Sequence, residues 1–282
     1  MALLDLLPPY IISLIEPGFL LYLAVKAYTQ VLIQGLLQDR RPPQDLRSKA
    51  FGKFWEQVSP VPDPSIPLAG SAILVPPLLA QASGNVLDVG PGSGSLIARF
   101  EPASPQITRI YGAEPATSLH KTLRRNADAT KVARKYHILS ANATRASIAA
   151  ELVKLGVITS PSDAKDIFDT IICVRVLCSV PDLTRTISDL HALLKPGGKL
   201  LVCEHTANPW RTSKGSVIAR VVQTLYMLMG WSYFVGDCEL TRDTEDELIK
   251  DSRQRWESVD IDRHFGHAVL TYVTGVLVKK GH

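Results

Sequence analysis

The sequence predicts an α/β fold with a mostly parallel sheet of seven strands that ends in an antiparallel hairpin. From residue 71 onward, apolar runs alternate with stretches of helical composition. Continuous apolar runs are typical of strands that helices cover on both faces, and short connections between alternating elements favour a parallel sheet. The last two extended runs stand too close together for a crossover helix, which indicates that they pair in antiparallel fashion.

The predicted strands follow in chain order. Five apolar runs account for the parallel part of the sheet, at residues 85–90, 107–114, 136–141, 168–177 and 198–205. Helical stretches lie between them, as at residues 116–129 and 182–194. The terminal hairpin consists of residues 256–265 and 268–280, with little more than Gly266 between them.

The composition is that of a folded protein. Of its 282 residues, 46% are hydrophobic and 21% are charged, so we expect a substantial core. The formal net charge is only +4, and no basic stripe is interleaved with aromatic residues, which disfavours nucleic acid as a partner.

The four cysteines, Cys173, Cys178, Cys203 and Cys238, form no CxxC pair, and three of them lie in or beside apolar runs. We therefore expect buried, reduced thiols in a cytosol-facing domain, with neither a disulfide framework nor a bound metal.

Residues 1–58 form an apolar N-terminal helical segment with a basic flank. The stretch from Pro17 to Gln38 has the length and apolarity of a helix that approaches bilayer thickness, with the proline in its first turn. Lys26 would lie near the middle, and Gln30 and Gln34 follow at helical spacing, so an interfacial or hairpin anchor is favoured over a clean span. The alternatives are a pair of apolar helices that caps the domain and a dimer contact.

Basic residues outnumber acidic ones in residues 39–53, directly after the apolar helix. If the helix associates with a membrane, this flank places the rest of the chain on the cytosolic side, at the endoplasmic reticulum or a similar membrane. Without that association the protein would be cytoplasmic. The proline-rich residues 59–70 predict an irregular connector, and residues 71–282 the α/β domain, in which residues 206–243 are an insertion that covers the substrate.

A glycine-rich turn follows the first strand, in the stretch VLDVGPGSGSL. Gly90, Gly92 and Gly94 are spaced as GxGxG, whereas a dinucleotide fingerprint would have a third glycine where Ser95 stands. A strand before the turn and a helix after it indicate a site for a nucleotide-like cofactor.

Two acidic residues accompany this turn. Glu114 ends the second strand, where a carboxylate accepts hydrogen bonds from both ribose hydroxyls, so an adenosine moiety is expected. S-adenosylmethionine carries no phosphates, and its methionine end needs backbone groups of the turn and an acid such as Asp88. The spacing of the turn and the terminal hairpin favour S-adenosylmethionine over NAD, which leaves an NAD-dependent reductase as the weaker alternative.

Six short motifs carry a family resemblance. VLDVGPGSG, YGAEP and LLKPGGKLLVCEH resemble motifs of class I S-adenosylmethionine-dependent methyltransferases. VLCSV at 176–180, EH at 204–205 and GDCELTRD at 236–243 resemble, more narrowly, the methyltransferase-like seven group of membrane-associated alkyl thiol methyltransferases. The resemblance implies a Rossmann-like methyltransferase fold and S-adenosylmethionine as the cofactor.

After the third strand, many class I enzymes place an acid against the adenine amino group, whereas this chain has SANAT. Its Ala141 and Asn142 would then contact adenine through a backbone amide and a side-chain carbonyl. The residues expected to bind the cofactor are therefore Asp88, Gly90, Gly92, Gly94, Glu114, Pro115, Ala141, Asn142 and Val176.

The candidate catalytic residues are Arg175, Glu204 and His205, because ligands in such sheets lie beyond the carboxyl ends of the strands. His205 is the candidate base for a hydroxyl or thiol, with a structural histidine as the alternative. Arg175 would pair with a substrate carboxylate or, alternatively, with an acid of the protein.

The residues before the hairpin predict the acceptor. We expect an adaptable apolar lining of the acceptor site from five residues: Met227, Met229, Trp231, Tyr233 and Phe234. The alternative is that these side chains pack in the core. We therefore expect methyl transfer to an oxygen or sulfur of a small lipophilic metabolite, for example as a tailoring step in secondary-metabolite biosynthesis. Detoxification of alkyl thiols follows from the resemblance alone, and a membrane-associated protein that binds the cofactor without catalysis is a further alternative.

Overall fold

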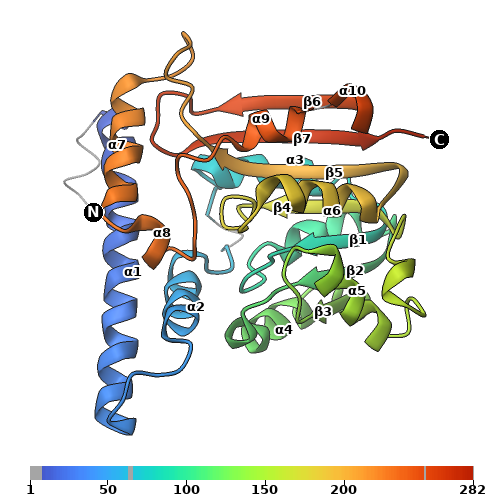
Figure 1. Ribbon diagram of the computed structural model, residues 1–282, viewed down its shortest axis with the longest axis horizontal. Coiled ribbons are helices and arrows are strands. Elements are labelled where there is room, and N and C mark those ends of the chain that lie inside the picture. Colours follow the sequence, from blue (N-terminus) through green and yellow to red (C-terminus); the bar gives the residue numbers. More distant parts are fainter. Residues whose placement is uncertain (1–7, 63–65, 251, 282) are drawn as a thin grey trace.

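The computed structural model describes residues 8–62, 66–250 and 252–281, and its centre is one sheet (Figure 1). The seven strands have the order β3-β2-β1-β4-β5-β7-β6. Their bounds are Gly84–Val89 for β1, Ile107–Ala113 for β2, Tyr136–Leu139 for β3, Phe168–Val174 for β4, Leu194–Thr206 for β5, Trp256–His264 for β6 and Thr271–Lys279 for β7. β1 to β5 pair in parallel, whereas β7 pairs antiparallel with both β5 and β6. The predicted fold class and the terminal hairpin are thus confirmed.

The second strand of the hairpin, β7, joins the sheet, and β6 forms its edge. The sequences of the two strands account for this order. β7 is almost continuously apolar and mostly buried, whereas β6 carries Glu257, Asp260, Asp262 and Arg263 and is largely exposed. Charged side chains on an edge strand discourage pairing with a further strand.

Helices cover both faces of the sheet. Those of the α/β domain are α3 (Val75–Leu79), α4 (His120–Asp128), α5 (Arg145–Lys154), α6 (Leu183–Leu193), α9 (Thr244–Ile249) and α10 (Ser252–Arg255). Short 3-10 helices are η2 (Gly70–Leu74), η3 (Ile97–Ala103), η4 (Thr117–Leu119), η5 (Ala133–Lys135) and η6 (Pro161–Asp163). The neighbours Val86 and Leu87 of β1 belong to opposite cores, because successive side chains of a strand point to opposite faces.

The N-terminal segment forms two helices, α1 (Pro9–Asp39) and α2 (Leu46–Val58). α1 begins eight residues before the predicted start at Pro17, so the placement of that proline in the first turn is wrong. Pro9 occupies the first turn instead, where its missing N–H has no intrahelical partner to lose, and Pro17 lies buried inside the helix. Residues 9–39 are one helix, so they contain no hairpin.

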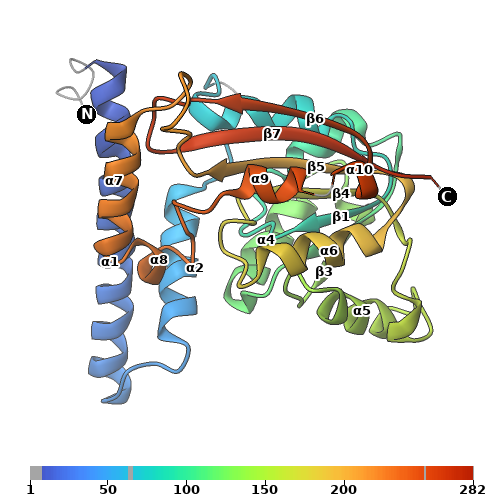
Figure 2. The same cartoon turned by 45° about the horizontal axis from the view of Figure 1, so that its top comes forward.

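α1 packs against α2 and also lies beside α7 (Val217–Leu228) and α8 (Trp231–Phe234), as Figures 1 and 2 show. The Tyr226 hydroxyl of α7 donates to the Leu14 carbonyl at 2.9 Å. A third core joins α1, α2 and α8 through residues that include Leu21, Ala24, Phe54 and Trp231. The apolar segment is therefore a built-in part of the structure.

We expect Lys279→Met to destabilise the fold by about 2 to 4 kcal/mol in urea-induced unfolding. Lys279 is buried near the end of β7, and its Nζ donates to Asp166 Oδ1 at 2.7 Å and to the carbonyls of His191 and Leu194 at 2.9 and 2.6 Å. Removal of the ammonium deletes three charge-assisted hydrogen bonds at a buried position. Lys280→Met, at the exposed next position, is the matched control and should leave stability nearly unchanged. Equal stabilities of the two variants would contradict this account.

Candidate cofactor and acceptor site

The segments that follow β1 to β5 border one cavity of about 970 Å³. They meet there because the carboxyl ends of parallel strands lie at the same edge of a sheet. The opposite wall comes from α1, α2 and the segment 231–238, so the N-terminal helices and the insertion close a cavity that the sheet leaves open. A cavity of this size accommodates a cofactor together with a small acceptor.

The glycine turn forms the floor of the cavity near β1. Gly90, Gly92 and Gly94 have φ angles of 64°, 59° and 79°, a left-handed conformation that side chains rarely adopt. A Cβ atom at Gly90 would lie 2.6 Å from Cγ2 of Val176, and one at Gly92 would overlap the indole of Trp55. The turn therefore needs glycine both for its backbone and for the close approach of α2 and the loop after β4.

Glu114 links the end of β2 to the glycine turn. Its Oε2 accepts the N–H of Gly92 at 2.9 Å, and its Oε1 accepts the N–H of Ala116 at 2.8 Å. Burial raises the pKa of Glu114, although both backbone hydrogen bonds lower it. Glu114 and Pro115 border the cavity, and each carboxylate oxygen retains a second lone pair for a ribose hydroxyl.

Asp88 lies beneath the turn and is bound to a residue that the sequence analysis did not single out. The Tyr136 hydroxyl donates to Asp88 Oδ2 at 2.8 Å, and it reaches across β2 because Gly112 leaves room for the ring. Burial raises the pKa of Asp88 to about 6, although the hydrogen bond from Tyr136 lowers it. Asp88 borders a small pocket of about 30 Å³ together with Gly90 and Arg175, and this pocket is large enough for a small polar group.

The residues after β3 are divided between the core and the cavity. Ala141 is buried in the core, whereas Asn142 borders the cavity. The Asn142 side-chain carbonyl already accepts the backbone N–H and the hydroxyl of Thr144, at 3.1 and 2.7 Å, and the backbone N–H of Asn142 donates to the Ser147 hydroxyl. These bonds fix the start of α5 and occupy the side-chain carbonyl of Asn142, the atom that was expected to contact adenine.

The loop after β4 carries Arg175 and Val176. Arg175 has a left-handed backbone with φ of 58°, a strained conformation that is common at functional sites. Its Nε is buried without a hydrogen-bond partner, and no ion pair with Arg175 is found in the described part of the chain. Arg175 borders both the cavity and the small pocket.

Glu204 and His205 lie near the end of β5, and their side chains point in different directions. Glu204 is fully buried outside the cavity lining, where both its oxygens accept the N–H of Val176, at 2.9 and 3.1 Å. Burial raises the pKa of Glu204 to about 7, against the lowering effect of this backbone bond. Glu204 therefore positions the loop after β4, while His205 borders the cavity.

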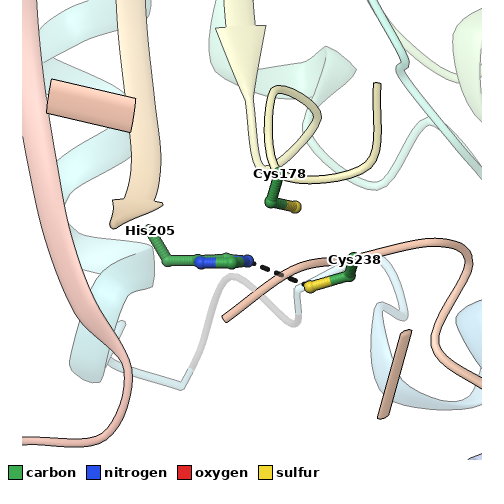
Figure 3. A group of neighbouring side chains, drawn as sticks. All are labelled: Cys178, His205 and Cys238. Atoms are coloured by element: carbon green, nitrogen blue, oxygen red, sulfur yellow. Dashed lines mark hydrogen bonds between the residues drawn. The ribbon is translucent and has the colours of Figure 1, made fainter. Parts of the chain in front are cut away.

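His205 meets two cysteines from distant parts of the chain. Its Nε2 lies 3.1 Å from Sγ of Cys238, and Cys178 approaches from the loop after β4 (Figure 3). All three residues are buried and border the cavity. All four cysteines are buried, as expected, but spacing along the chain could not show that two of them lie beside His205.

The insertion contributes part of the predicted apolar lining. Trp231 and Tyr233 border the cavity, whereas Met227 and Phe234 pack against the third core and Met229 is exposed. The composition of this stretch could not distinguish lining from core. Trp55 of α2, which the sequence analysis also did not single out, completes the wall over the glycine turn.

The strand order, the glycine turn and the acidic end of β2 together define a class I S-adenosylmethionine-dependent methyltransferase. Residues 67–265 match a family described as "Methyltransferase domain". The chain belongs to this family, and residues 67–265 are a methyltransferase domain of the kind that uses S-adenosylmethionine.

Parts of the chain are similar to curated enzymes. It is 32% identical over 82 residues to thiol S-methyltransferase TMT1B of Rattus norvegicus, and the alignment covers 29% of this chain and 31% of that protein. It is 33% identical over 131 residues to the ubiquinone biosynthesis O-methyltransferase of Xanthomonas euvesicatoria pv. vesicatoria, and the alignment covers 46% of this chain and 47% of that protein. The chain thus spans less than half the length of the curated relatives it matches.

Among solved structures, an O-methyltransferase family protein from Burkholderia thailandensis aligns with a TM-score of 0.53 at 14% identity. The alignment covers 96% of this chain and 72% of that chain. At this identity the likeness shows the fold.

The residues present fit S-adenosylmethionine. Glu114 retains acceptors for the ribose, and Arg175, whose Nε is buried without a hydrogen-bond partner in the described part of the chain, borders the small pocket. The bound cofactor supplies an electrophilic methyl group on a sulfonium. The protein aligns the acceptor with that methyl group and excludes water, which are the main tasks in an in-line displacement.

Protonation of Asp88 should weaken cofactor binding. The carboxylate is charged near neutral pH and becomes neutral as the pH falls through about 6, which removes its attraction for the ammonium group of the cofactor. Between about pH 7.5 and about pH 5.5 we expect the affinity for S-adenosylmethionine, measured by calorimetry, to fall about fourfold. Asp88→Asn should bind weakly at both pH values; a variant with the pH dependence of the wild type would count against this role.

Glu114→Ala should weaken binding of S-adenosylmethionine roughly 10- to 100-fold, because hydrogen bonds to a charged carboxylate are lost. Glu114→Gln keeps one side-chain oxygen that can accept a backbone N–H, so this variant should lose less affinity for S-adenosylmethionine than Glu114→Ala. Thermal unfolding of both variants without cofactor provides the control for folding. An unchanged dissociation constant for Glu114→Ala would show that β2 ends elsewhere relative to the ribose.

Proposed function

We propose that the protein transfers a methyl group to a sulfur or oxygen of a small lipophilic molecule that enters from a membrane surface. The observation that carries the proposal is the composition of the cavity wall. Pro9, Ser13, Glu16 and Leu20, from the first turns of α1, border the same cavity as the glycine turn. The part of the chain that is most apolar is thus also a wall of the methyl-transfer site.

An exposed apolar surface extends outward from this wall. We call it the α1–α7 face; its exposed side chains are Ile15, Phe19, Tyr22, Val25, Ile33, Leu36 and Leu37 of α1, Val217, Ile218, Val221, Leu225 and Leu228 of α7, and the following Met229. On α7 the buried positions are Ala219 and Gln223, so the apolar side faces solvent, the reverse of a helix in a soluble domain. Exposed apolar patches of this kind favour a lipid surface.

α1 is long enough and apolar enough to cross a membrane by length and composition. Its 31 residues correspond to about 46 Å. However, Lys26, Gln30 and Gln34 are all exposed on it, which favours a helix that lies in the interface. The basic residues that follow α1, among them Arg40, Arg41 and Lys49, would then contact anionic headgroups on the cytosolic side.

The acceptor chemistry is supported by the lining and by the relatives. Trp231, Val235 and Leu270 add apolar surface to the cavity, which suits a lipophilic acceptor. The two curated relatives are named for methylation of a thiol and for O-methylation in ubiquinone biosynthesis. Detoxification of alkyl thiols and tailoring of a secondary metabolite are both consistent with this class of acceptor.

The test is methyl transfer from labelled S-adenosylmethionine by the full-length protein in vesicles that contain a long-chain alkanethiol or a long-chain phenol. We expect labelled thioether or ether. We also expect Ile218→Asp/Val221→Asp/Leu225→Asp to reduce flotation with vesicles and to reduce the rate at least about tenfold, because three charges would enter the lipid interface. Its affinity for S-adenosylmethionine should stay unchanged.

The matched control is Leu155→Asp/Ile249→Asp/Val259→Asp, which places three charges at exposed apolar positions outside the α1–α7 face. Equal flotation of both triple variants and the wild type would contradict the membrane surface. Cofactor binding without label in either acceptor would contradict the acceptor class.

A further inference from the structure

We infer that Cys178, His205 and Cys238 bind a zinc ion whose fourth position opens to the acceptor cavity. In this inference, which rests on the proposed function for the acceptor, the zinc ion holds the sulfur of a thiol acceptor beside the methyl group. The inference differs from the expectation, drawn from the absence of a CxxC pair, that the chain binds no metal.

The first support is the geometry of the cluster. One ligand atom from each residue lies within 4.8 Å of the other two, and His205 Nε2 is 3.1 Å from Cys238 Sγ. In tetrahedral zinc sites with sulfur and nitrogen ligands, ligand atoms are about 3.5 to 3.8 Å apart. Small side-chain rotations therefore suffice for the three residues to bind one ion.

The second support is that three separate segments bring these side chains together. Cys178 lies in the loop after β4, His205 lies near the end of β5, and Cys238 lies in the insertion after α8 (Figure 3). Each segment belongs to one of the three short motifs VLCSV, EH and GDCELTRD. Cys173 and Cys203, by contrast, lie inside β4 and β5 among apolar core residues. The chain thus has two cysteines of each kind.

The third support is the weak hydrogen bonding of the His205 imidazole. His205 is only 5% exposed, and its Nδ1 is buried without a partner. Its Nε2 faces a thiol, which is a weak donor and a weak acceptor. A zinc ion at Nε2 would replace this weak contact with a coordinate bond from the imidazole nitrogen.

The surroundings of Cys238 also suit a metal-bound thiolate. The indole Nε1 of Trp231 donates to Cys238 Sγ at 3.2 Å. A hydrogen-bond donor aimed at a sulfur ligand is a common outer contact of metal sites, where it stabilises the negative charge on sulfur.

The number of ligands indicates the type of site. All three residues border the cavity. Structural zinc has four protein ligands, whereas catalytic zinc has three protein ligands and one open position. Two sulfur ligands and one imidazole form a soft donor set, which prefers zinc among the abundant divalent ions and favours a sulfur acceptor over an oxygen acceptor.

The reaction is balanced without a redox step. An acceptor thiol binds the open position and releases its proton to water, because coordination to zinc deprotonates a thiol. A new bond forms between the acceptor sulfur and the methyl carbon, and the bond from that carbon to the sulfonium breaks, with its electron pair left on S-adenosylhomocysteine. The thioether product carries no charge and leaves the ion. In this account His205 acts as a ligand, and no protein base is needed.

The test measures the metal in full-length protein in detergent, kept reduced with a phosphine, loaded with zinc chloride and dialysed. We expect about one zinc ion per chain by mass spectrometry. Cys178→Ser and Cys238→Ser should each lower zinc affinity at least about tenfold in a competition with a chromogenic chelator. Cys173→Ser/Cys203→Ser, the matched control, should keep the wild-type affinity. Binding of S-adenosylmethionine in every variant reports that the cofactor site is folded.

Cobalt provides a second readout that does not depend on activity. The Co²⁺-loaded wild type and the control should show the near-ultraviolet absorption of a cobalt–thiolate bond, and Cys238→Ser should show a weakened band. Equal zinc affinities of the cluster variants and the control would overturn the site. So would a zinc-free protein whose Cys178 and Cys238 form a disulfide when it is isolated without reductant.

The zinc inference and the proposed function fail in different ways. Methylation of an alkanethiol at the full rate by chelator-treated, zinc-free protein would overturn the inference and leave the proposed function standing. Stoichiometric zinc without methylation of any thiol would overturn the activation of the acceptor and argue against a sulfur acceptor. Loss of thiol methylation in zinc-free protein, with recovery on addition of zinc, supports both.

Discussion

The geometry of the site depends on one buried carboxylate, that of Glu204. It lies at the end of β5 with no exposed surface, and both its oxygens accept the N–H of Val176. A carboxylate that leaves water is costly unless hydrogen bonds replace those of the solvent. This bond fixes the loop after β4, and the loop carries both the strained Arg175 and Cys178. A residue without access to the cavity thus determines how the cavity is lined.

Much of the fold could be predicted from the sequence, because each buried strand is one continuous apolar run between polar segments. The antiparallel hairpin followed from the short distance along the chain between its two runs. The glycine turn and Glu114 were located for a similar reason, since both are fixed by their place after a strand. These features depend on local sequence, and local sequence is sufficient to find them.

The remaining features of the site arise from contacts between distant segments. Tyr136 reaches Asp88 across β2 only because Gly112 lies between them, and no local pattern shows that a tyrosine two strands further along the chain will point inward. Cys178 and Cys238 are sixty positions apart in the printed sequence. The start of α1 was missed for a different reason: Pro17 was interpreted as a helix start, whereas a buried proline is tolerated inside a long helix that other elements hold in place.

The position of Trp55 has a consequence for the boundary of the catalytic unit. Its indole lies against Gly92 and borders the cavity, yet it belongs to α2, in the segment before residue 67 where the family match begins. α2 in turn packs along α1. The family domain taken alone would therefore keep the glycine turn but lack the wall of the cofactor pocket that Trp55 forms. This wall depends on α2, which α1 holds in place, and α1 also contributes to the α1–α7 face. Removal of the N-terminal segment would therefore alter the cofactor pocket as well as the surface of the protein.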